Sequence, residues 1–269
     1  MKFCICNIAW DKAEDEQMYR ICSEMEYDGI EIAPTRIFPE NPYEHLDDAG
    51  CWARNLADKY GLKVYSCQSI WYGRKENIFG NEKERKCLLE HSKRAFSFAE
   101  VIGAENVVFG CPKNRNGYGK KREENSWIAM DFFRKMAEIA REHGIVLSIE
   151  ANPSIYGTDF LNNTQEALTF VNCLSVDSIK LNLDTGTMLC NAEKLKIVKG
   201  YEHMIGHVHI SEPHLTMIKE RKEYEELCDI LEKKDYDKAV SIEMKKQDRL
   251  DNLYKAMKYI RSIFACNKG

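Results

Sequence analysis

The sequence predicts a single (β/α)8 barrel, a TIM barrel, that spans residues 1–269 as one domain. Three observations lead to this fold class. Eight short apolar runs alternate with eight longer segments of helical periodicity. No linker or low-complexity segment divides the chain. The length of 269 residues is also close to the roughly 250 residues that such a barrel needs.

The eight apolar runs are expected to form strands at 3–8, 29–33, 63–68, 106–110, 145–150, 179–184, 205–210 and 239–243. Helices are expected at 14–27, 44–60, 82–102, 122–143, 164–174, 191–200, 217–234 and 249–265. Glycine follows several of these helices, as at Gly61 and Gly103, where a C-cap is typical. A doubly wound open sheet is the alternative, but it should show a glycine-rich turn after the first strand, and "NIAWDKAED" has none.

Composition narrows the classes of partner. The formal net charge is −4 and no basic stripe is visible, which argues against nucleic acid. No apolar run approaches 18 residues, so no membrane partner is expected, and "MKFCICNIAW" lacks a signal-peptide pattern. The 11 cysteines include no CxxC and predict free thiols in a reducing cytoplasm. The composition is compatible with a homo-oligomer.

Long connections follow three of the predicted strands. They read "PTRIFPENPYE", "SIWYGRKENIFGNE" and "CPKNRNGYGKK", whereas the helix-to-strand joints are short. In a barrel the strand-to-helix loops all open at the C-terminal face, where active sites lie. This asymmetry predicts a site at that end.

The last four strands carry polar residues at every second position. Because side chains alternate between the two faces of a strand, the aliphatic set belongs under the helices and the polar set inside the barrel. At the C-terminal end of each strand, the inward residue is expected to be a carboxylate or an imidazole: Glu150, Asp184, His209 and Glu243.

The stretch "HVHISEP" places His207 and His209 on the same face of one strand. Such a pair can form a metal site, act as a general acid or base, or fill a core. The neighbouring carboxylates favour His209 as a metal ligand at the rim and place His207 one layer deeper. Each acid could instead pair with a lysine, for which Lys180 and Lys245 are the candidates.

Three carboxylates and one imidazole in a small buried space repel one another unless a cation joins them. Borderline-to-hard donors of this kind favour Mn²⁺, Mg²⁺, Co²⁺ or Zn²⁺ over copper. We therefore expect one divalent cation held by Glu150, Asp184, His209 and Glu243.

The stretches "HGIVLSIEANP", "KLNLDTGTM", "HVHISE" and "VSIEM" occur in the order found in the xylose isomerase-like TIM barrels, and the sequence resembles that superfamily over essentially its whole length. The resemblance to its ketose 3-epimerase group implies Mn²⁺ as the most favoured ion. It also implies that Glu150 and Glu243 are catalytic and move protons. The predicted function is thus a metal-dependent isomerase or epimerase of a sugar or sugar derivative.

The chain departs from the epimerase pattern at two places. Thr187 stands where the epimerases have a histidine, and "HISEPHLTM" offers Glu212 and His214 but no arginine. Two alternatives therefore stay open: a lyase or dehydratase of a keto-sugar or keto-cyclitol, and a sugar-binding barrel without catalysis. Endonuclease IV, in the same superfamily, needs further histidines that "YSCQS" and "VVFGCP" lack.

Further residues at the predicted strand ends and in the loops could bind substrate. Trp10 and Trp71 could form an apolar wall, or pack as ordinary core. Lys113 could hold an anionic group, or lie in a solvated loop. The complete predicted substrate-binding set is Asn7, Trp10, Gln68, Trp71, Lys113, Glu212 and His214.

Overall fold

Eight parallel strands form a closed barrel in the order β1 to β8, as expected for a (β/α)8 barrel. The computed structural model describes residues 1–265, so residues 266–269 of the predicted 1–269 domain lie outside the described residues. The strands are β1 (Lys2–Cys6), β2 (Gly29–Ile32), β3 (Lys63–Cys67), β4 (Asn106–Phe109), β5 (Val146–Glu150), β6 (Ile179–Asp184), β7 (Ile205–Ser211) and β8 (Ala239–Glu243).

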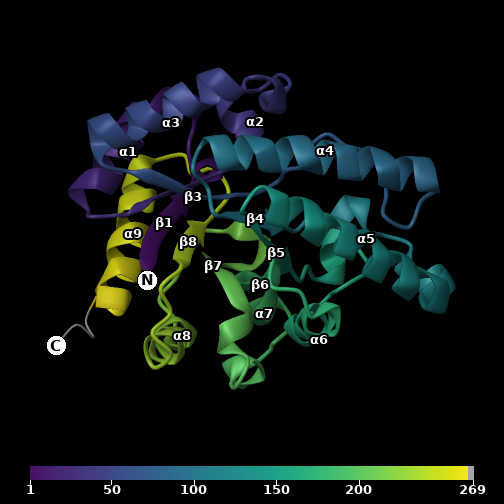
Figure 1. Ribbon diagram of the computed structural model, residues 1–269. Helices are drawn as coiled ribbons and strands as arrows, with labels where there is room; N and C mark the ends of the chain where they lie inside the picture. Colours follow the sequence, from purple (N-terminus) through teal and green to yellow (C-terminus); the bar gives the residue numbers. More distant parts are fainter. Residues whose placement is uncertain (266–269) are drawn as a thin grey trace.

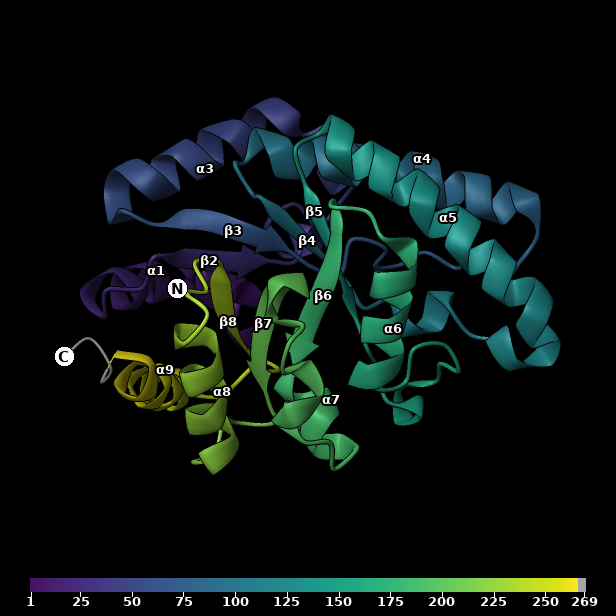
Figure 2. The same cartoon turned by 60° about the horizontal axis from the view of Figure 1, so that its bottom comes forward.

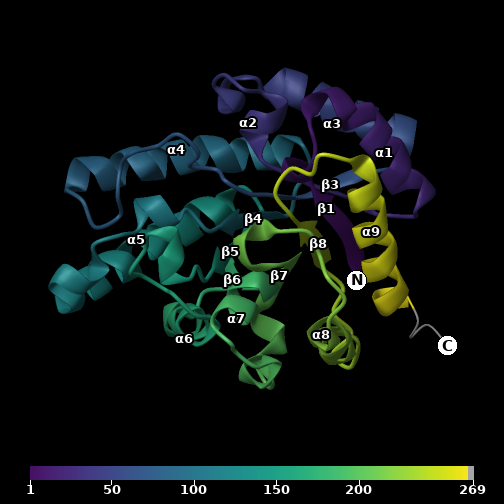
Figure 3. The ribbon, with the colours of Figure 1, turned by 180° about the vertical axis from the view of Figure 1, so that it is seen from behind.

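The helices form a layer around the outside of the strands (Figures 1 and 2). Seen from behind, α9 lies beside β1, so that the end of the described chain packs near its beginning (Figure 3). The helices are α1 (Asp15–Glu24), α2 (Pro34–Ile37), α3 (Leu46–Tyr60), α4 (Glu82–Val101), α5 (Arg122–Glu142), α6 (Thr164–Leu174), α7 (Thr185–Cys190), α8 (Lys222–Glu232) and α9 (Leu250–Ala265). Within residues 1–265, no helix is both long and apolar enough to cross a membrane.

The helix predicted at 191–200 was wrong. The helix after β6 is α7, which begins directly after the strand, and residues Leu195–Val198 form only a short 3-10 turn. Ala192 has a positive φ of 52°, which breaks the α-helical path between the two. Leu195 and Val198 are buried, and their spacing of three matches the 3-10 period. Of the segment predicted at 217–234, only Lys222–Glu232 is helical.

Side-chain alternation in the strands separates two cores. Leu181, Leu183, Val208 and Ile210 are buried and form part of the hydrophobic core of the molecule. The residues between them, such as Asn182 and His209, are equally buried but polar. The interior of the barrel is therefore built from polar groups that must satisfy one another, and this requirement sets up the site.

A cluster of aromatic rings supports the barrel on the side of α4 and α5. Phe133 is buried on α5, and its ring lies 5.0 Å from Phe109, 5.6 Å from Phe132 and 5.3 Å from Phe170, measured between centroids. All three contacts are edge-to-face, which is the favourable arrangement for ring quadrupoles. The cluster holds β4, α5 and α6 against one another.

Candidate metal centre

Four side chains from the last four strands converge at the C-terminal end of the barrel. Glu150, Asp184 and Glu243 end β5, β6 and β8, and His209 lies in β7. The Nδ1 atom of His209 lies 3.0 Å from Oε2 of Glu150, 3.2 Å from Oε2 of Glu243 and 3.9 Å from Oδ2 of Asp184. One ligand atom from each of the four lies within 4.8 Å of the others. Oxygen and nitrogen ligands bind divalent ions at about 2.0–2.6 Å, so these four atoms could surround one ion.

The sequence ended this strand at residue 210 and placed His209 at the rim, whereas the strand extends one residue further. Strand β7 continues to Ser211, which pairs with Glu243 of β8, while His209 pairs with Asp184 of β6. His209 is fully buried beneath the three carboxylates and forms the floor of the cluster. Ser211 takes the rim position, where its Oγ donates a hydrogen bond of 2.7 Å to Oδ2 of Asp184.

Asp184 also begins a helix. Its Oδ1 accepts a hydrogen bond from the backbone N–H of Thr187, so Asp184 is the N-cap of α7. The two oxygens are thus held from two elements, Oδ1 by α7 and Oδ2 by β7. This double constraint leaves the carboxylate one orientation, with Oδ2 facing the cluster.

The electrostatics are those of a crowded anionic site. Burial, together with the charges of Glu150 and Glu243, raises the pKa of Asp184 to about 7. Burial alone would also raise the pKa of Glu150, but hydrogen bonding and attraction from His209, with help from Asn152 and Arg115, hold it below its ordinary value. Burial would lower the pKa of His209, yet Glu31 and Glu243 raise it well above the ordinary range. The cluster thus holds more negative charge than its imidazole neutralises, which suits a divalent cation.

The alternative of local lysine pairing was not found. Among the described residues, neither Lys180 nor Lys245 forms an ion pair with the cluster. The nearby cation is instead Arg115, which is fully buried. Its Nη2 donates a hydrogen bond of 2.7 Å to Oδ1 of Asn152, whose Nδ2 donates one of 2.6 Å to Oε1 of Glu150. Arg115 therefore acts on Glu150 through an amide rather than by direct contact.

The remaining carboxylate oxygens are also held by amides. Nδ2 of Asn182, one layer below Asp184 on β6, donates a hydrogen bond of 2.6 Å to Oε2 of Glu150. Nε2 of Gln68 donates one of 2.7 Å to Oε1 of Glu243. Buried polar groups with such partners are preorganised, so the ligands need little rearrangement to receive an ion.

A cavity of about 200 Å³ opens above these ligands. Its walls come from the loops after β3, β4, β5, β6 and β7, and they include Tyr156, Thr187, Glu212 and Leu215. No lysine or arginine is among the described residues that line it. Gly110 forms part of the wall, and a Cβ there would lie 3.0 Å from Oε1 of Glu150, a tight contact that would press on that carboxylate.

Two of the predicted substrate-binding residues line this cavity, namely Gln68 and Glu212. Glu212 is buried, and its carboxylate accepts both Nε and Nη2 of Arg221, so its charge is already neutralised. Thr187, the residue that replaces the epimerase histidine, also lines the cavity, and its Oγ1 donates to the carbonyl of Ala151 at 2.9 Å.

Three other predicted residues lie in the interior and do not line the cavity. The indole N–H groups of Trp10 and Trp71 donate to Asp15 and Ser92, each at 2.8 Å. Oδ1 of Asn7 accepts the backbone N–H of Ala33 at 2.8 Å. These side chains thus hold the loops by hydrogen bonds in the interior and do not face the cavity.

Lys113 and His214 are exposed, and neither is among the residues that line the cavity. The backbone N–H of His214 donates to Oη of Tyr156 at 2.9 Å, which links the loops after β5 and β7 at the rim. Sequence reasoning did not select Tyr156, Asn152 or Ser211. Asn152 and Ser211 could have been found, because each follows a ligand at a spacing of two, in "EAN" and "HIS".

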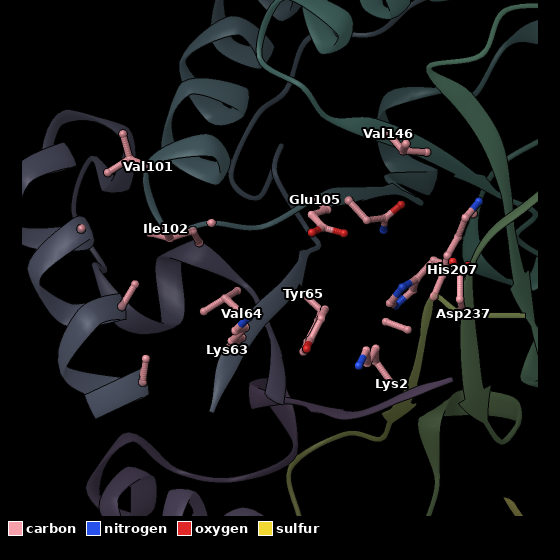
Figure 4. Close-up of a pocket in the computed structure, with 18 of the residues that line it drawn as sticks. Lys2, Lys63, Val64, Tyr65, Val101, Ile102, Glu105, Val146, His207 and Asp237 are labelled. Atoms are coloured by element: carbon pink, nitrogen blue, oxygen red, sulfur yellow. The ribbon is translucent and has the colours of Figure 1, made fainter. Parts of the chain in front are cut away.

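A larger cavity, of about 740 Å³, lies at the opposite end of the barrel (Figure 4). It is lined by residues at the beginnings of strands, among them Lys2, Lys63, Val146 and His207, and the ring of His207 faces it. Catalytic residues of TIM barrels lie at the C-terminal ends of the strands. The smaller cavity above the four ligands is therefore the candidate active site.

Comparisons with known proteins agree with the barrel fold. Similar solved structures include a 3-keto-D-glucoside 4-epimerase from E. coli, with a TM-score of 0.79 and 17% identity over 97% of this chain and 99% of that one. D-psicose 3-epimerase from Clostridium cellulolyticum, solved with D-tagatose, has a TM-score of 0.79 and 15% identity over 99% of this chain and 100% of that one. The IolI protein with a bound zinc atom has a TM-score of 0.72 and 16% identity over 98% of both chains.

No match was found among curated protein sequences. The family model of the xylose isomerase-like TIM barrel matches residues 19–263, a range that contains β2 to β8 and all four candidate ligands. The chain therefore belongs to the xylose isomerase-like TIM barrel family.

Proposed function

We propose that the protein is a metal-dependent isomerase or epimerase of an uncharged sugar or sugar derivative, with Glu150 and Glu243 as the proton-transfer groups. One observation carries the proposal: Glu150 and Glu243 flank Asp184 and His209 at the base of a small cavity. The two outer carboxylates come from β5 and β8, three strands apart, so they approach a bound molecule from different sides.

The donor set fits a divalent ion, for which we propose Mn²⁺ with Mg²⁺, Co²⁺ and Zn²⁺ as alternatives. When bound, such an ion polarises a carbonyl and acidifies the adjacent C–H. Glu150, held ionised by its amide partners and His209, is suited to accept that proton. Glu243, fixed by Gln68, is suited to return it from the other side.

The size and charge of the cavity support the substrate class. A volume of about 200 Å³ is below the roughly 300–1,000 Å³ of sites for drug-sized ligands, and suits a molecule of monosaccharide size. Phosphate and carboxylate groups are usually bound by arginine or lysine, and none lines this cavity among the described residues. The similar structures named for epimerases of sugars give independent support to this class.

Within the proposed site, Gln68 and Glu212 contact substrate hydroxyls. Asn7, Trp10 and Trp71 support the loops from behind, and Lys113 and His214 act at the outer rim. We place the enzyme in the cytoplasm, because nine cysteines of the described chain, among them the buried Cys4, Cys6 and Cys67, are free thiols. A homo-oligomer is compatible with this assignment.

Solvent exchange tests the proposal. Manganese-loaded protein is incubated in deuterated buffer with a panel of neutral ketoses and 3-keto-glucosides, and deuterium at carbon is followed by NMR. Glu150→Gln and Glu243→Gln should each lose at least about 10²-fold in exchange rate. Ser97→Ala, at a half-buried position of α4 that does not line the cavity, is the control.

The outcomes separate the rival functions. Exchange accompanied by loss of water from the substrate would assign a lyase instead. Binding of a sugar without any exchange would assign a sugar-binding protein. Wild-type exchange in either glutamine variant would remove that glutamate from proton transfer.

A further inference from the structure

A second group of titratable side chains lies directly beneath the four ligands. Glu31 of β2 is fully buried, as are His207 and His209 of β7. Oε1 and Oε2 of Glu31 lie 3.0 and 3.2 Å from Nε2 of His209, within hydrogen-bonding geometry. Nε2 of His207 lies 2.8 Å from Oε2 of Glu31. The carboxylate thus lies between two imidazoles, hydrogen-bonded to His209 and in close contact with His207, whose ring nitrogens make no hydrogen bond within the described residues.

The two nitrogens of His209 face different groups. Nδ1 faces Glu150, Asp184 and Glu243, and Nε2 faces Glu31. A neutral imidazole carries a proton on one nitrogen and a lone pair on the other. To bind an ion through Nδ1, His209 must keep its proton on Nε2, and a buried N–H needs an acceptor. Glu31 is placed to be that acceptor.

A neighbouring amide agrees with this assignment. Nδ2 of Asn182 lies 3.1 Å from Nδ1 of His209 and also donates to Oε2 of Glu150. An amide nitrogen can only donate, so it favours a ring nitrogen that presents its lone pair, as Nδ1 would when it binds an ion instead of donating to Glu150. Both neighbours of the ring therefore favour the same tautomer.

We propose that Glu31 is a positioning residue for the metal site, which fixes the tautomer and the ring orientation of His209, and that His207 locks the rotation of Glu31. The inference rests on the proposed metal-dependent function. Gln68 extends the connection, because its Nε2 lies 3.3 Å from Oε1 of Glu31 while it donates to Glu243. One buried carboxylate thus organises two of the four ligands.

An alternative is that this second group is itself an ion site, since the ligand atoms of Glu31, His207 and His209 also lie within 4.8 Å of one another. Two features argue against this. His209 would have to give a lone pair from both nitrogens and become an imidazolate. All three side chains are fully buried, and none of them lines the cavity above the four candidate ligands, so an ion among them would not face a substrate there.

Metal titration tests the role of Glu31. The dissociation constant for Mn²⁺ is measured by calorimetry in the wild type, Glu31→Leu, Glu31→Gln and Ser148→Ala. Loss of a carboxylate behind a ligating histidine weakens metal affinity by about 10–100-fold, and we expect that loss in Glu31→Leu. Glu31→Gln keeps one oxygen for the Nε2–H and should lose less. Ser148→Ala should keep wild-type affinity, because Ser148 is buried beneath the site but donates to Asn106 rather than to a ligand.

Imidazole ¹⁵N NMR of zinc-loaded protein provides a readout besides affinity, and it serves even if Glu31→Leu does not fold. The wild type should show His209 protonated on Nε2 alone, and Glu31→Gln should show a shifted Nε2–H resonance. Wild-type affinity in a folded Glu31→Leu variant, or two ions per wild-type chain, would overturn the inference while leaving the proposed function in place. A wild type that binds no ion would overturn both.

Discussion

At the residue scale, Asp184 combines a structural and a chemical task. It caps α7 with one oxygen and faces the other ligands with the second. Because burial and two neighbouring carboxylates raise its pKa to about 7, the folded protein without an ion binds a proton at Asp184 more tightly than the unfolded chain does. The pKa of His209 is also raised, so the folded protein holds the proton of His209 more tightly than the unfolded chain does.

This predicts how pH affects stability. A raised folded pKa contributes stability at low pH that is lost as pH rises, here from about 4 to about 7 for Asp184 and through the raised pKa of His209. A bound ion needs both groups deprotonated, so the gain in melting temperature on adding Mn²⁺ should be larger at about pH 8 than at about pH 6. Thermal denaturation with and without Mn²⁺ measures this. Asp184→Asn should weaken the pH dependence, and an equal gain at both pH values would contradict the assignment.

The same scale shows what could be predicted from sequence. The alternation of side chains between the two faces of each strand was enough to place four residues of the last four strands in one inward set: Glu150, Asp184, His209 and Glu243. It could not show that β7 extends to Ser211, because that end is set by the pairing of Ser211 with Glu243 of β8. Nor could it join Glu31 to His209, since these residues lie 178 positions apart and only closure of the barrel brings them together.

At the element scale, Phe133 packs α5 against β4 and α6. Phe133→Ala removes a buried ring that touches Phe109, Phe132 and Phe170, and should lower the free energy of unfolding by about 3–5 kcal/mol. Trp127→Ala on the same helix is the matched control. Its side chain is 76% exposed, so the change should stay within about 0.5 kcal/mol. Urea unfolding of both variants measures the difference, and similar losses would show that the aromatic cluster does not stabilise the barrel.

The helix after β6 shows where local pattern failed. The apolar positions of residues 191–200 suggested an α-helix there. The helix after β6 is instead α7, which begins directly after its N-cap residue Asp184. Asp184 was predicted as a metal ligand, and a strand-end aspartate does not show by itself that it also caps the following helix. By contrast, α4, α5, α6 and α9 lie within about one residue of their predicted ends.

At the scale of the whole molecule, a bound ion would join β5, β6, β7 and β8 at their C-terminal ends. An ion at about 100 times its dissociation constant stabilises the folded state by about 2.7 kcal/mol. Removal with a chelator should therefore lower the melting temperature. Hydrogen exchange should also show a loss of amide protection at the ends of these four strands that exceeds any loss in β1 to β4. Uniform changes in all eight strands would mean that no ion is held at this end of β5 to β8.

The linked rim loops have a consequence for redesign. The proposed ligands and their immediate partners belong to strands or follow them directly, whereas Tyr156, His214 and Leu215 belong to connections that close over the cavity. These rim residues are thus separate in sequence from the candidate ligands. If the proposed function is right, a library that varies 154–158 and 213–219 should change the substrate preference while the strands that carry the candidate ligands stay unchanged.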